Sequence, residues 1–112
     1  MELIERATET AIAACRPGVT VGTVVETALD VLRPSPWAGS VGAMMGHGIG
    51  LETVEEPYLS PGSPTVLEPG ICLCVEPGVF VPNEVGAVVE QEIIISSAGP
   101  PELITPTPTR LW

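Results

Sequence analysis

The sequence predicts an α+β fold in which two helices pack on a mostly antiparallel sheet. Apolar residues recur at helical spacing over the first third of the chain, whereas short β-rich runs separated by turns follow from residue 35 onward. The chain also contains 12 glycines and 13 prolines among 112 residues, about twice their average share. That content predicts short elements joined by many turns instead of a helical bundle.

Two helices are expected in the first third of the chain. The first, over residues 2–15, ends at the stop signal Arg16-Pro17-Gly18. Its apolar stripe consists of Leu3, Ile4, Ala7, Ala11, Ile12 and Ala14. The second is predicted over residues 21–32, because Thr20 suits an N-cap position and Pro34 ends the stripe. Its β-branched residues lower its intrinsic helix propensity, so packing must stabilise it.

The remainder of the chain is predicted to form strands. Residues 71–76 and 78–81 are β-rich and flank Pro77. The run 86–96 is the strongest strand signal, and residues 82–84 before it predict a hairpin. The proline-rich tail is expected to lie extended along a surface. With no internal repeat and no boundary signal, residues 1–112 are expected to form a single domain.

The composition narrows the class of protein. Fourteen acidic residues oppose four basic ones, none of them lysine, and the formal charge of −10 argues against nucleic acid or an anionic membrane as partner. An apolar content of 45% argues against an acidic disordered tail. The three cysteines lack CxxC spacing, and no uncharged apolar run is long enough to span a bilayer. A soluble protein of the reducing cytoplasm is therefore expected.

Three short segments carry candidate chemistry. Gly46-His47-Gly48 brackets the single histidine with glycines, which suits close approach to a bound group, although an ordinary turn with a solvated histidine remains open. Glu76 ends an apolar strand. Glu90 and Glu92 share one face of the predicted strand 86–96, and at least one is expected to point inward. A buried carboxylate in a chain without lysine favours a metal partner, with a solvated edge strand as the alternative.

These motifs together resemble a known family. The segments GHGIGLETVEEPYL (46–59), LEPGICLCVEPGVFVP (67–82) and GAVVEQEIIIS (86–96) closely resemble the C-terminal half of the pita-bread metallopeptidases. That family includes methionine aminopeptidase, Xaa-Pro aminopeptidase and prolidase, with creatinase as a metal-free relative. The resemblance covers almost the whole chain. It implies half of a pita-bread fold, with a curved sheet, forming the C-terminal portion of a catalytic domain.

The resemblance also assigns residues. It implies that His47, Glu76 and Glu90 are the metal-binding and catalytic residues, with Glu90 bridging two divalent ions of Mn, Co, Zn or Fe that activate water against a peptide or small amide. The family also uses two aspartates from its N-terminal half, whereas the one aspartate here, Asp30, matches neither. Two carboxylates and a neutral imidazole suit one ion at most. We therefore expect this part of the enzyme to be inactive by itself, or to lack metal altogether.

Two further departures concern the substrate. Val54 stands where the family often has a second histidine, and Val88 where it often has an arginine. Losing a donor of this kind costs on the order of 100- to 1,000-fold in turnover. Cys72 and Cys74 share strand parity with Glu76, which would allow a thiolate ligand, but core filling is the favoured interpretation.

Three functional hypotheses follow. The first is the C-terminal part of a metal-dependent aminopeptidase or Xaa-Pro dipeptidase-like hydrolase, as a truncated product or one piece of a split protein. The second is a non-peptidase relative, a C–N hydrolase or lyase. The third is a catalytically dead module that binds a peptide or a partner. A half fold exposes an apolar face, so a homodimer or pairing with an N-terminal half-domain is expected.

Overall fold

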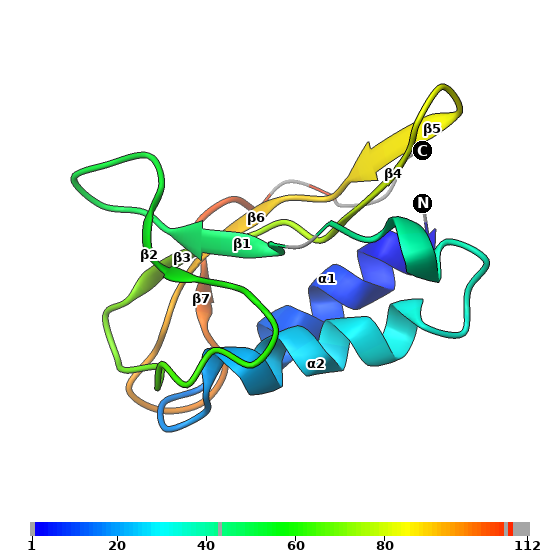
Figure 1. Cartoon of the computed structure of the whole chain (residues 1–112). Coiled ribbons are helices and arrows are strands. Elements are labelled where there is room, and N and C mark those ends of the chain that lie inside the picture. The colour runs from blue at the N-terminus through cyan, green and yellow to red at the C-terminus, as the bar shows by residue number, and fades with distance from the viewer. Residues whose placement is uncertain (1, 43, 107, 109–112) are drawn as a thin grey trace.

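Two helices pack on one face of a five-stranded antiparallel sheet in the computed structural model (Figure 1), which describes residues 2–42, 44–106 and 108. The sheet has the strand order β2-β1-β3-β6-β7, and a separate hairpin pairs β4 with β5. The prediction of an α+β fold is confirmed. The elements in chain order are α1 (Glu2–Ala14), α2 (Val21–Leu32), the 3-10 turn η1 (Ala38–Ser40), β1 (Gly46–Gly48), β2 (Glu55–Tyr58), β3 (Cys72–Val75), β4 (Gly78–Val81), β5 (Val85–Val88), β6 (Gln91–Ile94) and β7 (Glu102–Leu103).

Both predicted helices are present at nearly the expected bounds. Thr20 is the N-cap of α2: its backbone is extended and its hydroxyl accepts a hydrogen bond from the Thr23 amide at 3.2 Å. The apolar stripes of α1 and α2 face each other and the sheet, and the two helices pack side by side. The packing that the β-branched α2 requires is therefore supplied by α1 and the strands.

The main core lies between the helices and the sheet. Leu73, Val75 and Ile93 point from β3 and β6 into the same buried cluster as Val24 and Ala28 of α2. Because side chains alternate along a strand, the intervening residues of β3 and β6 face the opposite side of the sheet. That second face carries the candidate site. Within the described residues, no helix is both long and apolar enough to cross a membrane.

The run 86–96, predicted as one strand, is two strands in different sheets. β5 pairs with β4 in the projecting hairpin, whereas β6 pairs with β3 in the main sheet. The chain bends at Val89-Glu90, where Val89 is buried with Ile4 and Val79 in a second apolar cluster. Val89 is apolar because it fills this cluster, and β-rich residues lie on both sides of the bend, so the pattern of residue types did not reveal the break.

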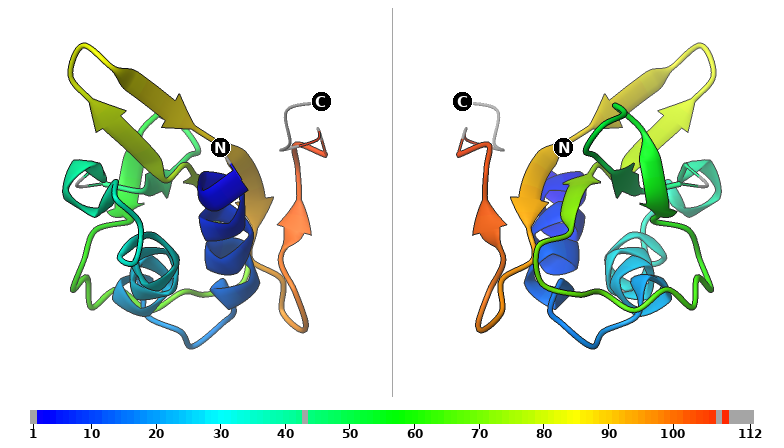
Figure 2. Two further views of the ribbon diagram at one scale, coloured as in Figure 1. Left: turned by 90° about the vertical axis from the view of Figure 1, so that its right-hand side faces the viewer. Right: turned by 90° about the vertical axis from the view of Figure 1, so that its left-hand side faces the viewer.

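The β4–β5 connection is the predicted hairpin, with Asn83 at φ 62° in its turn. The side views show this hairpin extending away from the helices (Figure 2). The tail was expected to lie extended on a surface, and its exposed residues Glu102–Leu103 do so by adding β7 to the edge of the sheet beside β6. Residues 107 and 109–112 of the tail lie outside the described part of the chain.

Candidate metal centre

The sheet register places three potential ligands in one row. His47 of β1 pairs with Cys74 of β3, and Cys74 pairs with Glu92 of β6. Residues that pair directly across antiparallel strands present their side chains on the same face. Imidazole, thiol and carboxylate therefore lie side by side on the face opposite the helices.

The glycines around His47 allow its neighbouring strands to come close. A Cβ on Gly46 would overlap the carbonyl oxygen of Cys74, and a Cβ on Gly48 would overlap the carbonyl oxygen of Glu56. Any other residue at either position would push β3 or β2 away from β1. The Gly-His-Gly motif thus positions the imidazole by close strand contact, and the alternative of an ordinary turn with a solvated histidine is wrong. His47 lies in a strand and is only 7% exposed.

The ring of His47 is oriented by its own strand. Its Nδ1 lies 2.9 Å from the carbonyl oxygen of Gly48. A carbonyl can only accept, so Nδ1 carries the hydrogen and, in the neutral ring, Nε2 keeps its lone pair. Nε2 lies 3.8 Å from Oε1 of Glu76. A lone pair and a carboxylate oxygen facing each other at this separation fit a shared cation.

Glu76 and Glu90 converge on a single thiol. The thiol of Cys74 donates toward Oε1 of Glu90 at 3.0 Å, and its sulfur lies 3.4 Å from Oε2 of Glu76. Burial, the hydrogen bond to Glu90 and the negative charge of Glu76 raise the pKa of Cys74 above its ordinary value. A local excess of negative charge therefore surrounds this sulfur.

The structure places the three residues expected to bind metal as follows. It brings His47 and Glu76 together directly, and it connects Glu90 to them through Cys74. Ligand atoms of His47, Cys74 and Glu76 all lie within 4.8 Å of one another. Imidazole nitrogen, sulfur and carboxylate oxygen are donors that a divalent transition ion accepts, so this set fits a metal of the expected kind.

Two sequence-based interpretations at this face need correction. Glu90 is exposed and Glu92 is half-buried, so neither points into the interior as expected. The reason is that the described residues leave Glu90 exposed at the bend and Glu92 partly exposed on this face of β6. Cys74, interpreted as core filler, is buried but lies on the site face. Its strand parity with Glu76 was the signal that could have placed it there.

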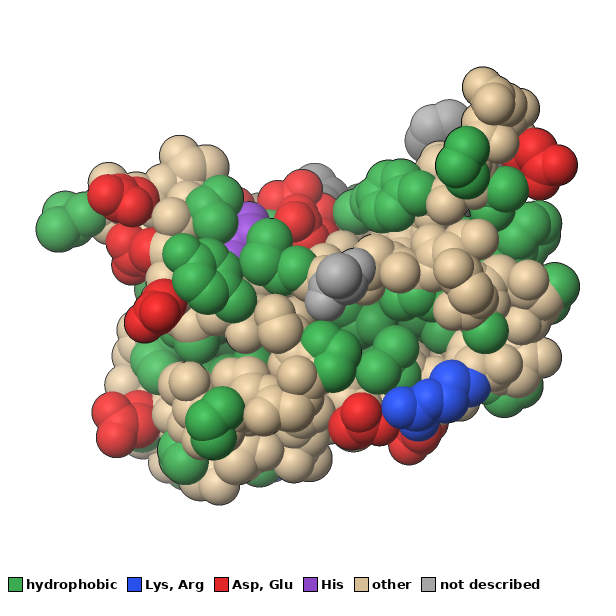
Figure 3. All heavy atoms as spheres, viewed as in Figure 1, with side chains coloured by type: hydrophobic (Ala, Val, Ile, Leu, Met, Phe, Trp, Pro, Cys, Tyr) green, Lys and Arg blue, Asp and Glu red, His purple; other side chains and the backbone are tan. Residues whose placement is uncertain are grey.

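A hollow of about 470 Å³ adjoins these residues. Its lining consists of His47, Ile49, Gly50, Leu51, Glu52, Thr53, Cys72, Glu90 and Glu92. The loop 49–54 between β1 and β2 forms one wall, and the space-filling view shows the histidine at the surface beside acidic side chains (Figure 3). Val54 and Val88 are both exposed. The carboxylate of Glu55 accepts the Glu52 amide at 3.2 Å, so it closes its own loop.

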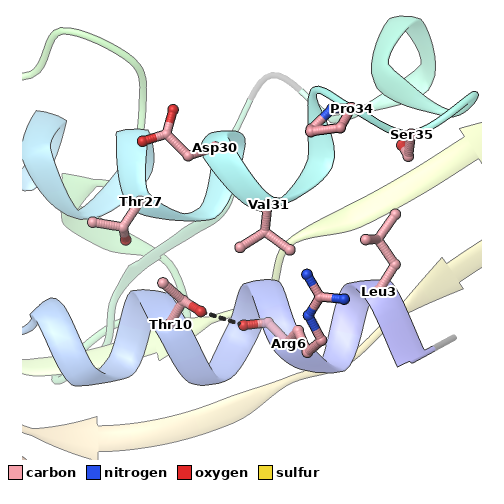
Figure 4. Close-up of a pocket in the computed structure, with 8 residues that line it drawn as sticks. All are labelled: Leu3, Arg6, Thr10, Thr27, Asp30, Val31, Pro34 and Ser35. Carbon is pink, nitrogen blue, oxygen red and sulfur yellow. Dashed lines mark hydrogen bonds between the residues drawn. The ribbon is translucent and has the colours of Figure 1, made fainter.

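Asp30 lies elsewhere in the fold. It borders a groove of about 580 Å³ between α1 and α2, together with Leu3, Arg6 and Val31 (Figure 4). Its carboxylate forms an ion pair with Arg33 at 2.6 Å. Asp30 lies on the helical layer, whereas His47, Cys74 and Glu92 lie on the face of the sheet opposite the helices. Asp30 therefore does not complete the candidate metal site.

Comparisons with known proteins identify a family and relatives of similar fold. The model of metallopeptidase family M24 matches residues 1–97. The chain is 43% identical over 65 residues to the probable dipeptidase PepE of Mycobacterium tuberculosis (strain ATCC 25618 / H37Rv), an overlap of 58% of this chain and 17% of that protein. It shares 34% identity with the solved dipeptidase PepE from Mycobacterium ulcerans, at a TM-score of 0.93 over 98% of this chain and 29% of that one.

A second solved structure, the Xaa-Pro dipeptidase from Bacillus anthracis, shares 34% identity at a TM-score of 0.91. The match covers 98% of this chain and 31% of that one. This chain therefore spans less than a third of the length of the relatives named here.

Proposed function

Because this chain belongs to metallopeptidase family M24, we propose that it is the C-terminal, metal-binding part of a dipeptidase or Xaa-Pro peptidase-like hydrolase. Membership confirms the resemblance inferred from the three motifs, and the close structural likeness to the two dipeptidases confirms half of a pita-bread fold. Those relatives are described as a dipeptidase and an Xaa-Pro dipeptidase. The proposed substrate class is accordingly a short peptide.

The pair His47–Glu76 is the observation that carries this proposal. Gly48 holds Nδ1, so Nε2 faces Glu76 Oε1 at 3.8 Å from a nearly buried position. With Glu90 close by, these residues would hold a divalent ion such as Mn, Co, Zn or Fe. A bound ion of this kind supplies Lewis-acid activation of water for attack on an amide carbonyl. The hollow beside the row would receive the peptide, with loop 49–54 as its wall.

We further propose that this chain is inactive without additional ligands. Glu76 and Glu90 supply two negative charges. Two divalent metal ions carry four positive charges, which these two carboxylates do not balance. Asp30 is committed to Arg33 on the helical layer. The two aspartates would therefore come from a partner segment equivalent to the N-terminal half of the catalytic domain. That half would cover the open face of this chain, where Val54, Val88 and Phe80 are exposed.

The free cysteines suggest the compartment in which the protein acts. The described residues include three free thiols, at Cys15, Cys72 and Cys74. Unpaired cysteines are typical of reducing compartments, so we propose that the protein acts in the cytoplasm.

Calorimetric titration with Mn²⁺ and Zn²⁺ tests the site. Glu76→Gln removes a proposed ligand with almost no change in size, and Glu102→Gln on the exposed strand β7 is the matched control. We expect Glu76→Gln to weaken binding by at least about 100-fold, because even residues that only support ligands are worth 10- to 100-fold. The control should bind like the unmodified chain. Equal binding by all three proteins would contradict the assignment.

A chimera tests the activity. Residues 2–97 of this chain would replace the matching segment of the M. ulcerans dipeptidase, which supplies the rest of that domain. We expect hydrolysis of dipeptides in the presence of Mn²⁺ and its loss on Glu76→Gln. A folded chimera that binds metal through Glu76 yet cleaves no dipeptide would contradict the peptidase proposal. It would favour the non-peptidase or partner-binding hypotheses.

A further inference from the structure

Cys74 occupies the centre of the proposed metal site. It lies between His47 and Glu92 in the sheet register, and the residue is only 1% exposed. The two neighbours of Cys74 on β3, Leu73 and Val75, point into the core beneath the helices. The position of Cys74 therefore differs from that of a cysteine that fills a core.

Two separations between donor atoms, each to a different carboxylate oxygen of Glu76, match those around a small ion, and one donor atom from each of His47, Cys74 and Glu76 lies within 4.8 Å of the other two. Bonds of about 2.0–2.3 Å in a tetrahedral zinc site leave neighbouring ligand atoms roughly 3.3–3.8 Å apart. Here the sulfur of Cys74 lies 3.4 Å from Oε2 of Glu76, and Nε2 of His47 lies 3.8 Å from Oε1 of Glu76. The contact of the sulfur with Glu90, at 3.0 Å, places a further oxygen beside this group.

No lysine or arginine in the described part of the chain supplies a cation to these carboxylates. Within residues 2–42, 44–106 and 108, no arginine forms an ion pair with Glu76 or Glu90. Arg33 pairs with Glu26 and Asp30 on the helical layer. The thiol has a single hydrogen to share between two carboxylates. An ion in contact with all of these donors would satisfy them together.

We propose that Cys74 is a sulfur ligand of this centre, which therefore prefers Zn²⁺ or Co²⁺ to Mn²⁺. The inference rests on the proposed function, because it takes His47 and Glu76 as ligands of the same ion. It goes beyond that function by naming a further ligand and the class of metal. Sulfur favours the softer ions of the first transition row, whereas oxygen donors suit Mn²⁺ equally well. On coordination the thiol hydrogen is released to solvent and the sulfur binds the ion in its place.

Absorption spectroscopy with Co²⁺ tests this inference on the full chain. Sulfur bound to Co²⁺ gives an intense near-ultraviolet charge-transfer band, whereas nitrogen and oxygen ligands give only weak visible bands. We expect the intense band in the unmodified chain and its loss in Cys74→Ser. Cys72→Ser is the matched control, because Cys72 lies two residues earlier on the same face of β3, and it should keep the band.

The two proposals fail in different ways. Visible bands that depend on His47, without the charge-transfer band, would overturn the sulfur ligand and leave the metal site standing. A band that survives Cys74→Ser would also overturn it. Absence of any Co²⁺ spectrum that depends on His47 or Glu76 would overturn the metal site and the inference together. As a second readout, Cys74→Ser should weaken Zn²⁺ binding at least about tenfold while changing Mn²⁺ binding little.

Discussion

The sulfur of Cys74 lies 3.0 Å from the carboxylate oxygen Oε1 of Glu90, although the two residues are 16 positions apart in the chain. The contact exists because the chain bends at Val89-Glu90 and then joins β3 as β6. The contact links the expected ligand Glu90 to His47 and Glu76. Glu90 shares no strand with either residue. The site therefore depends on how three strands are placed side by side.

Gly46→Ala and Gly48→Ala should both damage the site. Each added Cβ would overlap a carbonyl oxygen of an adjacent strand, which should lower the free energy of unfolding by about 1–3 kcal/mol. The resulting shift of β1 should also weaken Zn²⁺ binding, because His47 moves with it. Urea unfolding and calorimetric titration measure the two effects. Gly39→Ala is the control, since nothing lies within 4 Å of its Cβ position; comparable losses in this variant would refute the steric explanation.

Leu73→Ala should destabilise the fold from beneath the site. Leu73 is fully buried between the sheet and the helices, so truncation should cost about 2–5 kcal/mol of unfolding free energy. Leu51→Ala makes the same chemical change at a fully exposed residue of loop 49–54 and should stay within about 0.5 kcal/mol of the unmodified chain. Chemical denaturation of the three proteins gives the comparison. The packing would be misassigned if the two variants lost similar stability.

Thr20→Ala should weaken the start of α2. The hydroxyl of Thr20 accepts the Thr23 amide at 3.2 Å, and loss of such a cap costs about 1 kcal/mol, within a range of 0.5–2. The midpoint of urea unfolding should fall accordingly. Thr10→Ala is the control, because the Thr10 hydroxyl donates to the Arg6 carbonyl within an already formed helix. A cap role would be contradicted if Thr10→Ala cost as much.

Cys15 should make the fold less stable at alkaline pH. Burial raises the pKa of its thiol from 9.0 to about 12. Above pH 9 the unfolded chain releases this proton while the folded chain keeps it, so stability falls as pH rises from about 9 toward 12. The slope per proton reaches at most about 1.4 kcal/mol per pH unit.

Urea unfolding between pH 7 and pH 11 tests this dependence, with Cys15→Ala as the comparison. The variant lacks the titrating group, so its stability should decline less steeply above pH 9 even though its cavity lowers stability at every pH. Parallel declines in the two proteins would show that Cys15 does not contribute to the alkaline loss.

Much of the fold follows from local patterns. The bounds of α1 and α2, the Thr20 cap and the β4–β5 turn depend on spacing and on residues close in sequence, and the structure confirms them. The run 86–96 was misinterpreted because a buried valine at a bend has the same apolar signature as one within a strand. Short-range periodicity reports burial, and it does not report which neighbour a segment pairs with.

The candidate site shows the same division. The amino-acid types at His47, Glu76 and Glu90, and their order along the chain, were enough to indicate the family, to which the chain belongs. Strand parity with Glu76 indicated the face on which Cys74 lies, but the sequence could not show which residues of other strands lie beside it. Only the pairing of β1 and β6 on either side of β3 decided this, by setting His47, Cys74 and Glu92 in one row. Sequence by itself determined the helices and the candidate donor residues. The tertiary structure determined which of these residues meet, because register depends on cross-strand contacts between residues far apart in the chain.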